Sequence, residues 1–272
     1  MRALAAVAVL LLFPATAGAT LYGGGTAPDS VRRANDQLTL VGFGVADDGS
    51  GVGRVTVNVA AGCGVAKVTR DIGLAADGTF TMEKTKTERV GGGVRQRSEV
   101  SMSGQIVGAV GSGTVRALVT FRRGGRVVER CDSGDRQWNV RASGTPGAGS
   151  PPGGYYGLTN QSGRAFAFVL TLAGSRVRVA AFDYRMRCRR GGFEWENITP
   201  GGRLAADGSF SLRERFSRPW REGRERFRVK VDGAFTPSGV SGRLSVTSIL
   251  RSPGGRVLDR CTTGRLRFSA VP

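Results

Sequence analysis

The chain has 272 residues, of which 40 are Lys or Arg and 21 are Asp or Glu, so its formal net charge is +19. It contains no histidine, which excludes Ser-His-Asp and Cys-His catalysis and zinc or copper sites with histidine ligands. No nucleophile-elbow or phosphate-binding loop motif occurs either, and we expect neither a cofactor nor a metal.

The first 19 residues predict a secretory signal. Arg2 precedes the apolar run Ala3–Phe13, which is too short to span a bilayer, and Ala17-Gly18-Ala19 fits a cleavage site. We expect cleavage rather than an uncleaved anchor because the run is short. The protein is therefore predicted to be secreted, and to lie outside the cell or in its envelope.

Two stretches of the sequence recur at one offset of 130 residues. Gly124–Cys131 matches Gly254–Cys261, and Leu74–Phe80 matches Leu204–Phe210. Because two separate matches share the offset, the chain is predicted to hold two copies of one domain.

The copies begin at a shared Tyr-x-Gly-x-Thr pattern, which starts at Tyr22 and again at Tyr155. We expect the first copy at 20–142 and the second at 155–272. The segment 143–154 between them is almost entirely Ser, Gly, Thr, Pro and Ala, and it is predicted to be a linker.

Short Val-rich runs separated by Gly, Asp and Ser predict strands throughout both copies. The first run in each copy is apolar on both faces, which is typical of a central strand. The fold class that we expect is all-β, with two tandem antiparallel β-sandwich domains, jelly-roll or Ig-like, of about eight strands each. The runs are 37–46, 55–59, 100–106, 114–122, 127–131 and 137–142, then 164–172, 177–181, 227–235, 243–250, 257–261 and 266–270.

Asp77-Gly78 and Asp207-Gly208 separate two strand-like runs in each copy, and they predict tight hairpin turns because Asp-Gly accepts positive φ. The strands that follow, and the last strand of each copy, are predicted to bury large apolar side chains. These are Phe80, Met82 and Trp138 in the first copy, and Phe210, Leu212 and Phe268 in the second.

Each copy holds one cysteine after its second strand and one before its last strand. This repeat predicts the disulfides Cys63–Cys131 and Cys188–Cys261. A redox or metal site is the alternative, but the chain has neither Cys-x-x-Cys spacing nor histidine to support it.

Carboxylates are the remaining candidates for catalysis, because glycan hydrolysis needs two acids that face each other. The acids that we consider are Glu83, Glu99, Glu194, Glu196 and Glu214, which the two copies do not share. The shared acid, Glu129 in the first copy and Asp259 in the second, is predicted to lie on a solvated face. Asp47-Asp48 begins a short segment that resembles part of a calcium-binding loop. Its spacing does not fit the EF-hand pattern, so we expect a hairpin turn there.

Charge differs between the copies. Residues 20–143 hold 17 basic and 12 acidic side chains, a net of +5, whereas residues 153–272 hold 22 and 9, a net of +13. Alternating cations at 226, 228 and 230 predict a basic strand face, with residues 218, 220 and 221 at the neighbouring hairpin tip. The ligand-binding residues that we expect are Arg213, Arg215, Arg218, Trp220, Arg221, Arg226, Arg228 and Lys230.

An ordinary charged exterior is the alternative interpretation of this stretch, with the cations balanced by Glu214, Glu222 and Glu225. We expect the partner to be an anionic polymer, a cell-wall component or a membrane surface, and nucleic acid stays open. The corresponding function is an exported binding or envelope-associated protein. The alternatives are a carboxylate-dependent glycan-acting enzyme and a structural or adhesive protein.

The order of turn, cysteine and core residues resembles uncharacterised secreted β-sandwich proteins of actinobacteria. The resemblance covers both copies, and it implies export and a β-sandwich fold without implying any catalytic residue. In the second copy it rests on Tyr155, Gly157, Thr159, Cys188, Asp207, Gly208, Phe210, Gly233, Cys261, Gly264 and Phe268.

Overall fold

The computed structural model describes residues 19–28, 31, 37–46, 51–143, 152–189, 191–220 and 223–272. The predicted signal segment up to residue 18, the Asp47-Asp48 turn and most of the predicted linker lie outside these ranges. Within them, no helix has the length and apolar character needed to cross a membrane.

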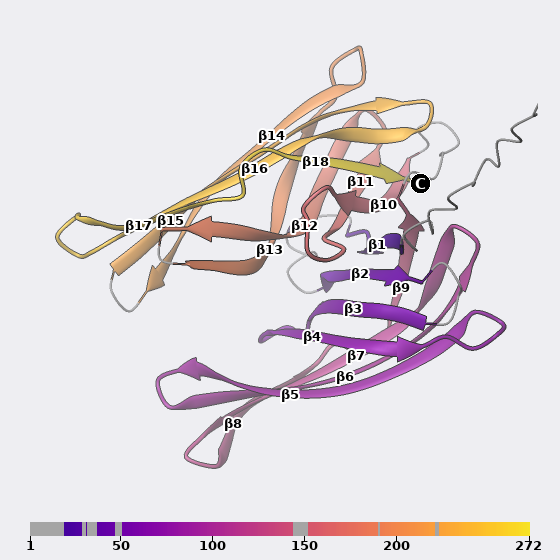
Figure 1. Ribbon diagram of the computed structural model, residues 1–272. Helices are drawn as coiled ribbons and strands as arrows, with labels where there is room; N and C mark the ends of the chain where they lie inside the picture. Colours follow the sequence, from indigo (N-terminus) through magenta and orange to yellow (C-terminus); the bar gives the residue numbers. More distant parts are fainter. Residues whose placement is uncertain are drawn as a thin grey trace, which may run out of the picture.

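The described residues form two antiparallel sheets of nine strands each (Figure 1). The first sheet contains β1 (Thr20–Thr26), β2 (Thr39–Val45), β3 (Gly51–Ala60), β4 (Val65–Gly73), β5 (Thr79–Gly91), β6 (Val94–Val107), β7 (Val110–Arg123), β8 (Arg126–Asp132) and β9 (Arg136–Ala142). The second contains β10 (Gly153–Thr159), β11 (Ala167–Ala173), β12 (Arg176–Cys188), β13 (Gly191–Arg203), β14 (Ser209–Trp220), β15 (Gly223–Thr236), β16 (Gly239–Arg251), β17 (Val257–Thr262) and β18 (Leu266–Val271). The prediction of an all-β protein with two tandem antiparallel units is confirmed.

The two sheets share one topology. The first has the strand order β4-β3-β2-β1-β9-β7-β6-β5 with β8 paired to β7, and the second repeats this order with β13 and β14 at its ends. Most neighbours are therefore consecutive hairpin strands. The last strand of each unit pairs with the first strand. The sheet can therefore be completed only after the whole unit has been synthesised.

Each sheet folds over a core of its own, because the apolar residues of its strands alternate toward one side. Trp138 and Phe80 lie together in the first core, with ring centroids 5.9 Å apart, and both are buried. In the second core, Phe268 stacks on Phe168 at 4.0 Å. The predicted core residues of both copies are confirmed.

The two Asp-Gly turns form as expected, but they do not make hairpins. Gly78 and Gly208 have φ of 81° and 77°. However, β4 and β5 lie at opposite ends of the hydrogen-bonded strand order, as do β13 and β14. Each turn instead carries the chain from one end of its sheet to the other, where the curvature of the sheet brings both ends over the same core. The hairpin prediction was therefore wrong, because turn chemistry specifies the bend and not the strand that pairs after it.

The sheets pack against each other through their first three strands, β1–β3 on β10–β12 (Figure 1). The buried residues of this layer are Leu38, Leu40, Ala60, Ala167, Val169 and Ala181. The prediction that the first apolar run of each copy is central is confirmed. Each of these runs is buried on its second face because that face contacts the other sheet.

Glycines allow the two backbones to approach closely at this junction. A Cβ atom added to Gly23 would overlap the carbonyl oxygen of Gly157, and one added to Gly42 would overlap the carbonyl oxygen of Ala165. Both glycines belong to the first sheet, and the carbonyl groups that they approach belong to the second unit. The units are therefore held by a packed interface, in addition to the chain segment that joins them.

Both predicted disulfides are present, Cys63–Cys131 and Cys188–Cys261, and the structure has no free cysteine in its described residues. The second sheet adds a short ladder at this point, in which Cys188 pairs with Cys261 and Arg187 with Thr262. Because β17 also pairs with β16, this ladder closes a ring of hydrogen-bonded strands. At the corresponding point of the first sheet, the disulfide Cys63–Cys131 is present but β8 pairs with β7 alone among the described strands.

Removal of the first disulfide should destabilise the protein. The bridge joins residues 68 apart, and closing such a loop stabilises the folded state by about 4 kcal/mol on the chain-entropy model. We therefore expect the Cys63→Ser/Cys131→Ser variant to unfold at lower urea concentration, in an unfolding experiment followed by circular dichroism. Free-thiol titration of the unfolded, unreduced wild type is the control and should give no thiol. An unchanged midpoint would contradict the prediction.

Candidate functional site

The predicted basic residues of β14 and β15 form one exposed face. In the antiparallel ladder Arg213 lies opposite Lys230, and Arg215 lies opposite Arg228. Arg226 follows one step further along β15, opposite Ser217. All five cations are exposed, whereas the residues that alternate with them on β15, such as Phe227 and Val229, are buried. Strand alternation thus gathers the charge on the outer side of the sheet.

Two further arginines, on β16 and β17, extend this face. The ladder sets Arg226 opposite Ile249, and Ile249 opposite Arg260. Arg251 lies opposite Arg224, one step beyond. A shallow groove of about 670 Å³ crosses these strands. We call it the arginine groove, and its outward-facing lining is Arg215, Ser217, Arg226, Arg228, Thr247, Ile249, Arg251, Arg260 and Thr262.

Arg251 and Arg260 were not among the predicted site residues. The signal that could have found them is strand alternation on β16 and β17, combined with the register that aligns them with β15. That register is set by turn lengths and by a bulge between Leu250 and Arg251, which the residue pattern alone does not specify.

No acidic residue is among the described residues that line the arginine groove. Two of the acids proposed to balance it, Glu214 and Glu225, point to the inner side of the sheet. Glu214 accepts hydrogen bonds from Asn197 and Thr199, and Glu225 is buried and accepts one from Ser248. The third acid, Glu222, lies outside the described residues. The inward acids leave the groove strongly positive.

Arg218 is placed differently from the prediction. It lies within β14, opposite Glu225, and not at the hairpin tip. Its guanidinium forms a 2.8 Å ion pair with Glu225 and lies 4.2 Å from the centre of the Trp195 ring. The tip assignment was wrong because β14 continues as a paired strand to Trp220. Even-numbered residues of β14 face inward, so Arg218 points away from Arg215. The side chain of Trp220 and all of Arg221 lie outside the described residues.

The corresponding face of the first sheet is neutralised by acids. Glu83 occupies the ladder position of Arg213, and Glu99 that of Arg228. Glu99 pairs with Arg97 at 2.7 Å. On the neighbouring strands, Arg116 pairs with Asp132 at 2.5 Å and holds the pKa of that carboxyl at about 2. A continuous basic face is therefore a property of the second sheet, although both sheets share the framework.

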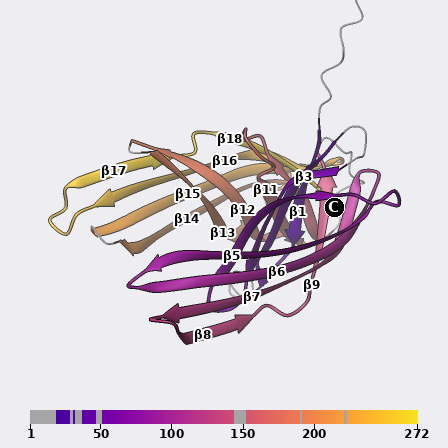
Figure 2. The ribbon, with the colours of Figure 1, turned by 60° about the horizontal axis from the view of Figure 1, so that its bottom comes forward.

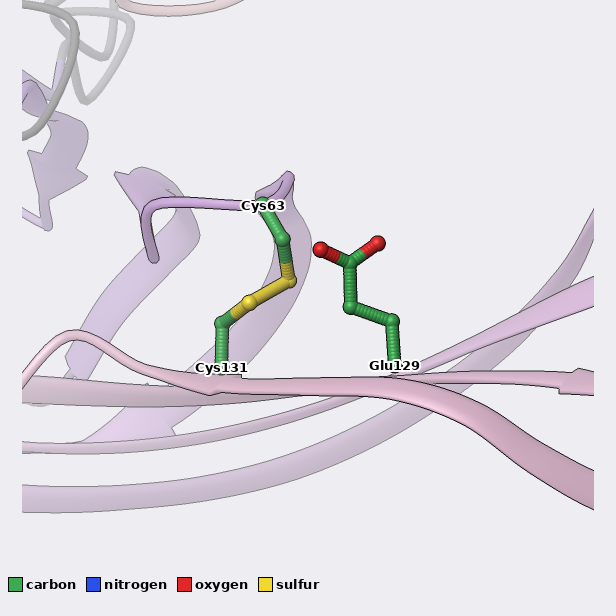
Figure 3. A group of neighbouring side chains, drawn as sticks. All are labelled: Cys63, Glu129 and Cys131. Carbon is green, nitrogen blue, oxygen red and sulfur yellow. A yellow bond between two sulfur atoms is a disulfide. The ribbon is translucent and has the colours of Figure 1, made fainter.

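The acid shared by the two copies lies beside each disulfide. Glu129 projects from β8 next to Cys63–Cys131, and both lie on the same side of the strand (Figure 3). Asp259 has the same place beside Cys188 and Cys261, where it accepts hydrogen bonds from the backbone N–H groups of Arg189 and Arg260. Because the sulfurs are bonded to each other, they offer no thiolate to a metal. Asp259 therefore has a local structural role, whereas Glu129 is exposed, as expected for a solvated face.

A second group of charged residues lies where the two sheets meet. Arg164 bridges Asp183 at 3.3 Å and Glu194 at 3.0 Å, and Lys67 of the first sheet reaches Glu194 at 3.6 Å. Asp183 is fully enclosed, and this burial raises its pKa to about 7 although Arg164 and Lys67 oppose the shift. Burial also raises the pKa of the neighbouring Glu196. The junction thus holds two carboxyl groups whose pKa values are raised by burial.

The structure brings two of the five candidate acids together. Glu196 and Glu214 line one hollow of about 250 Å³ between the sheets. Burial raises the pKa of Glu214, against the effect of its hydrogen bonds from Asn197 and Thr199. The other candidates lie elsewhere: Glu194 is in the ion pairs described above, and Glu83 and Glu99 are on the outer side of the first sheet.

The chain matches no known protein-family model, no curated protein and no solved structure. The chemistry of the two sites is therefore drawn from their residues alone.

The buried Asp183 should make stability depend on pH. Its folded pKa of about 7 lies above the ordinary value of 3.8, so the folded state binds the proton more tightly and stability falls as pH rises from about 4 to 7. We expect Asp183→Asn to reduce this fall by about 1 kcal/mol or more, measured by urea unfolding across that range. The exposed Asp135→Asn should leave the slope unchanged. Equal slopes for wild type and Asp183→Asn would contradict the prediction.

Proposed function

We propose that this protein is an exported anion-binding protein that holds a segment of a linear anionic polymer in the arginine groove of the second sheet. One observation carries the proposal. Five arginines from four neighbouring strands, namely Arg215, Arg226, Arg228, Arg251 and Arg260, line a single groove in which no described acidic residue takes part.

The length of the basic face favours a polymer over a single ion. Alternate residues of a strand are about 7 Å apart, so the steps from Arg228 to Arg224 on β15 extend over roughly 14 Å. Lys230, one step further, is paired with Asp232 at 2.5 Å. A single phosphate or carboxylate can engage only two or three of these side chains. A chain with repeated charges can engage most of them, and each guanidinium can bind a phosphate or carboxylate through two parallel hydrogen bonds.

The floor of the groove suits a polymer backbone. It consists of Ser217, Thr247, Ile249 and Thr262, whose short side chains leave space between the arginines and provide three hydroxyl donors. Phe216 and Phe227 stack on each other at 4.6 Å on the inner side of the sheet, so among the described residues neither ring is offered flat to a ligand. Stacking of nucleic-acid bases is therefore not supported, and we propose recognition of backbone charge alone.

The groove arginines should control binding to a polyanion. We expect the Arg215→Ala/Arg228→Ala variant to elute from immobilised heparin or polyphosphate at lower salt than the wild type. The slope of log affinity against log salt should fall by about 2, one for each lost contact.

The matched control is Arg176→Ala/Arg178→Ala, which removes the same charge from exposed positions on β12 outside the groove. It should elute close to the wild type. Equal losses in the two double variants would mean that net charge alone causes retention, and the proposed site would then be rejected. Single-stranded DNA that binds more tightly than polyphosphate of equal charge would reject the backbone-charge proposal.

The carboxylate-dependent glycan-acting enzyme has one observation in its favour, the shared hollow of Glu196 and Glu214. Their surroundings differ, since Asn197 and Thr199 donate to Glu214 whereas Lys67 lies near Glu196. An enzyme would release reducing ends from a cell-wall glycan and lose at least about 100-fold activity in Glu214→Gln. The anion-binding proposal predicts no release by wild type or variant.

A further inference from the structure

The hairpin ends of the first sheet combine exposed valines with arginines. Among the described residues six large apolar side chains are exposed, and three of them are gathered here: Val90 at 48%, Val127 at 50% and Val128 at 54%. Val90 precedes the β5–β6 turn, and the other two follow the β7–β8 turn. We call this end of the sheet the valine tip.

Arginines lie on the same strands and turns as these valines. The ladder aligns Arg89, Arg95, Arg122 and Val127 across four neighbouring strands, so three cations lie side by side on one rung. The next rung sets Arg123 opposite Arg126 in the β7–β8 hairpin. All of these arginines are exposed, and none forms an ion pair with a described carboxylate within 4.0 Å. The nearby Glu88 pairs with Lys86 instead.

We infer that the valine tip docks on an anionic lipid surface. Exposed valines gain nothing from a hydrated polyanion, whereas partial insertion between lipid headgroups removes their apolar surface from water. Arginines at the same depth meet the negative headgroups, which attract cations close to the surface. The combination of both residue types at a protruding end is the feature that favours lipid over polymer.

The arrangement of the hairpins fits a planar partner. In both ribbon views the free ends of β5–β6 and β7–β8 point to the same side as those of β14–β15 and β16–β17 (Figures 1 and 2). The corresponding end of the second sheet is also basic, with Arg224 and Arg251 on one rung and Arg256 in the turn. One anionic surface can therefore meet both ends. This inference is independent of the proposed polymer binding.

Vesicle flotation tests the inference. The chain from Thr20 onward keeps every described strand and avoids the apolar segment before it. We expect it to float with vesicles of phosphatidylcholine mixed with phosphatidylglycerol, and to stay behind with phosphatidylcholine alone. Val127→Ser/Val128→Ser should weaken binding at least about tenfold, because two half-exposed valines lose their apolar burial.

Two control variants separate the valine tip from the remaining exposed valines and from the arginine groove. Val107→Ser/Val110→Ser changes two exposed valines at the opposite end of β6 and β7, and it should bind like wild type. Arg215→Ala/Arg228→Ala should also keep most of its vesicle binding while losing polyanion affinity. The inference is overturned if wild type does not float with anionic vesicles, or if Val127→Ser/Val128→Ser binds them as tightly as wild type.

Discussion

Close packing of the two sheets at their first strands is the constraint on which the rest of the structure depends. Gly23 and Gly42 let the backbones meet, and Leu40 of β2 and Val169 of β11 lie in the shared apolar layer. Once β1–β3 and β10–β12 are covered in this way, the strands that retain a free outer side are those further along each sheet, in particular β5–β8 and β14–β17. The junction thus decides which surfaces can meet a partner.

Those free surfaces differ between the sheets through a few substitutions on one framework. Where the first sheet has Glu83, Glu99 and Asp132, the second has Arg213, Arg228 and Thr262 in the same ladder positions. Glu99 and Asp132 of the first sheet pair with Arg97 and Arg116, whereas Glu214 and Glu225 of the second sheet lie on its inner side and Asp232 pairs with Lys230 beyond the groove. The two sheets thus carry different charges on one shared strand order.

Much of the fold could be predicted from the sequence, because alternation, turn residues and the internal repeat act locally or through a simple offset. The disulfides, the core aromatics and the central strands were obtained in this way. Partners across strands were not, since register and sheet order depend on distant contacts. Hence Arg251 and Arg260 were missed, and Arg218 was assigned to the hairpin tip although it lies within β14. The ion cluster around Asp183 was also missed, because sequence does not show that two units share a buried interface.

The ladder that joins β12 to β17 beside Cys188–Cys261 has a mechanical consequence. Under the proposed function, a polymer held on β16 and β17 would pull on β17, which the disulfide ties covalently to β12, and β12 lies in the junction with the first sheet. Tension therefore passes into the body of the molecule through a sulfur–sulfur bond, where hydrogen bonds alone would open one after another. The covalent bond thus makes the connection between β17 and the junction resistant to a pulling force.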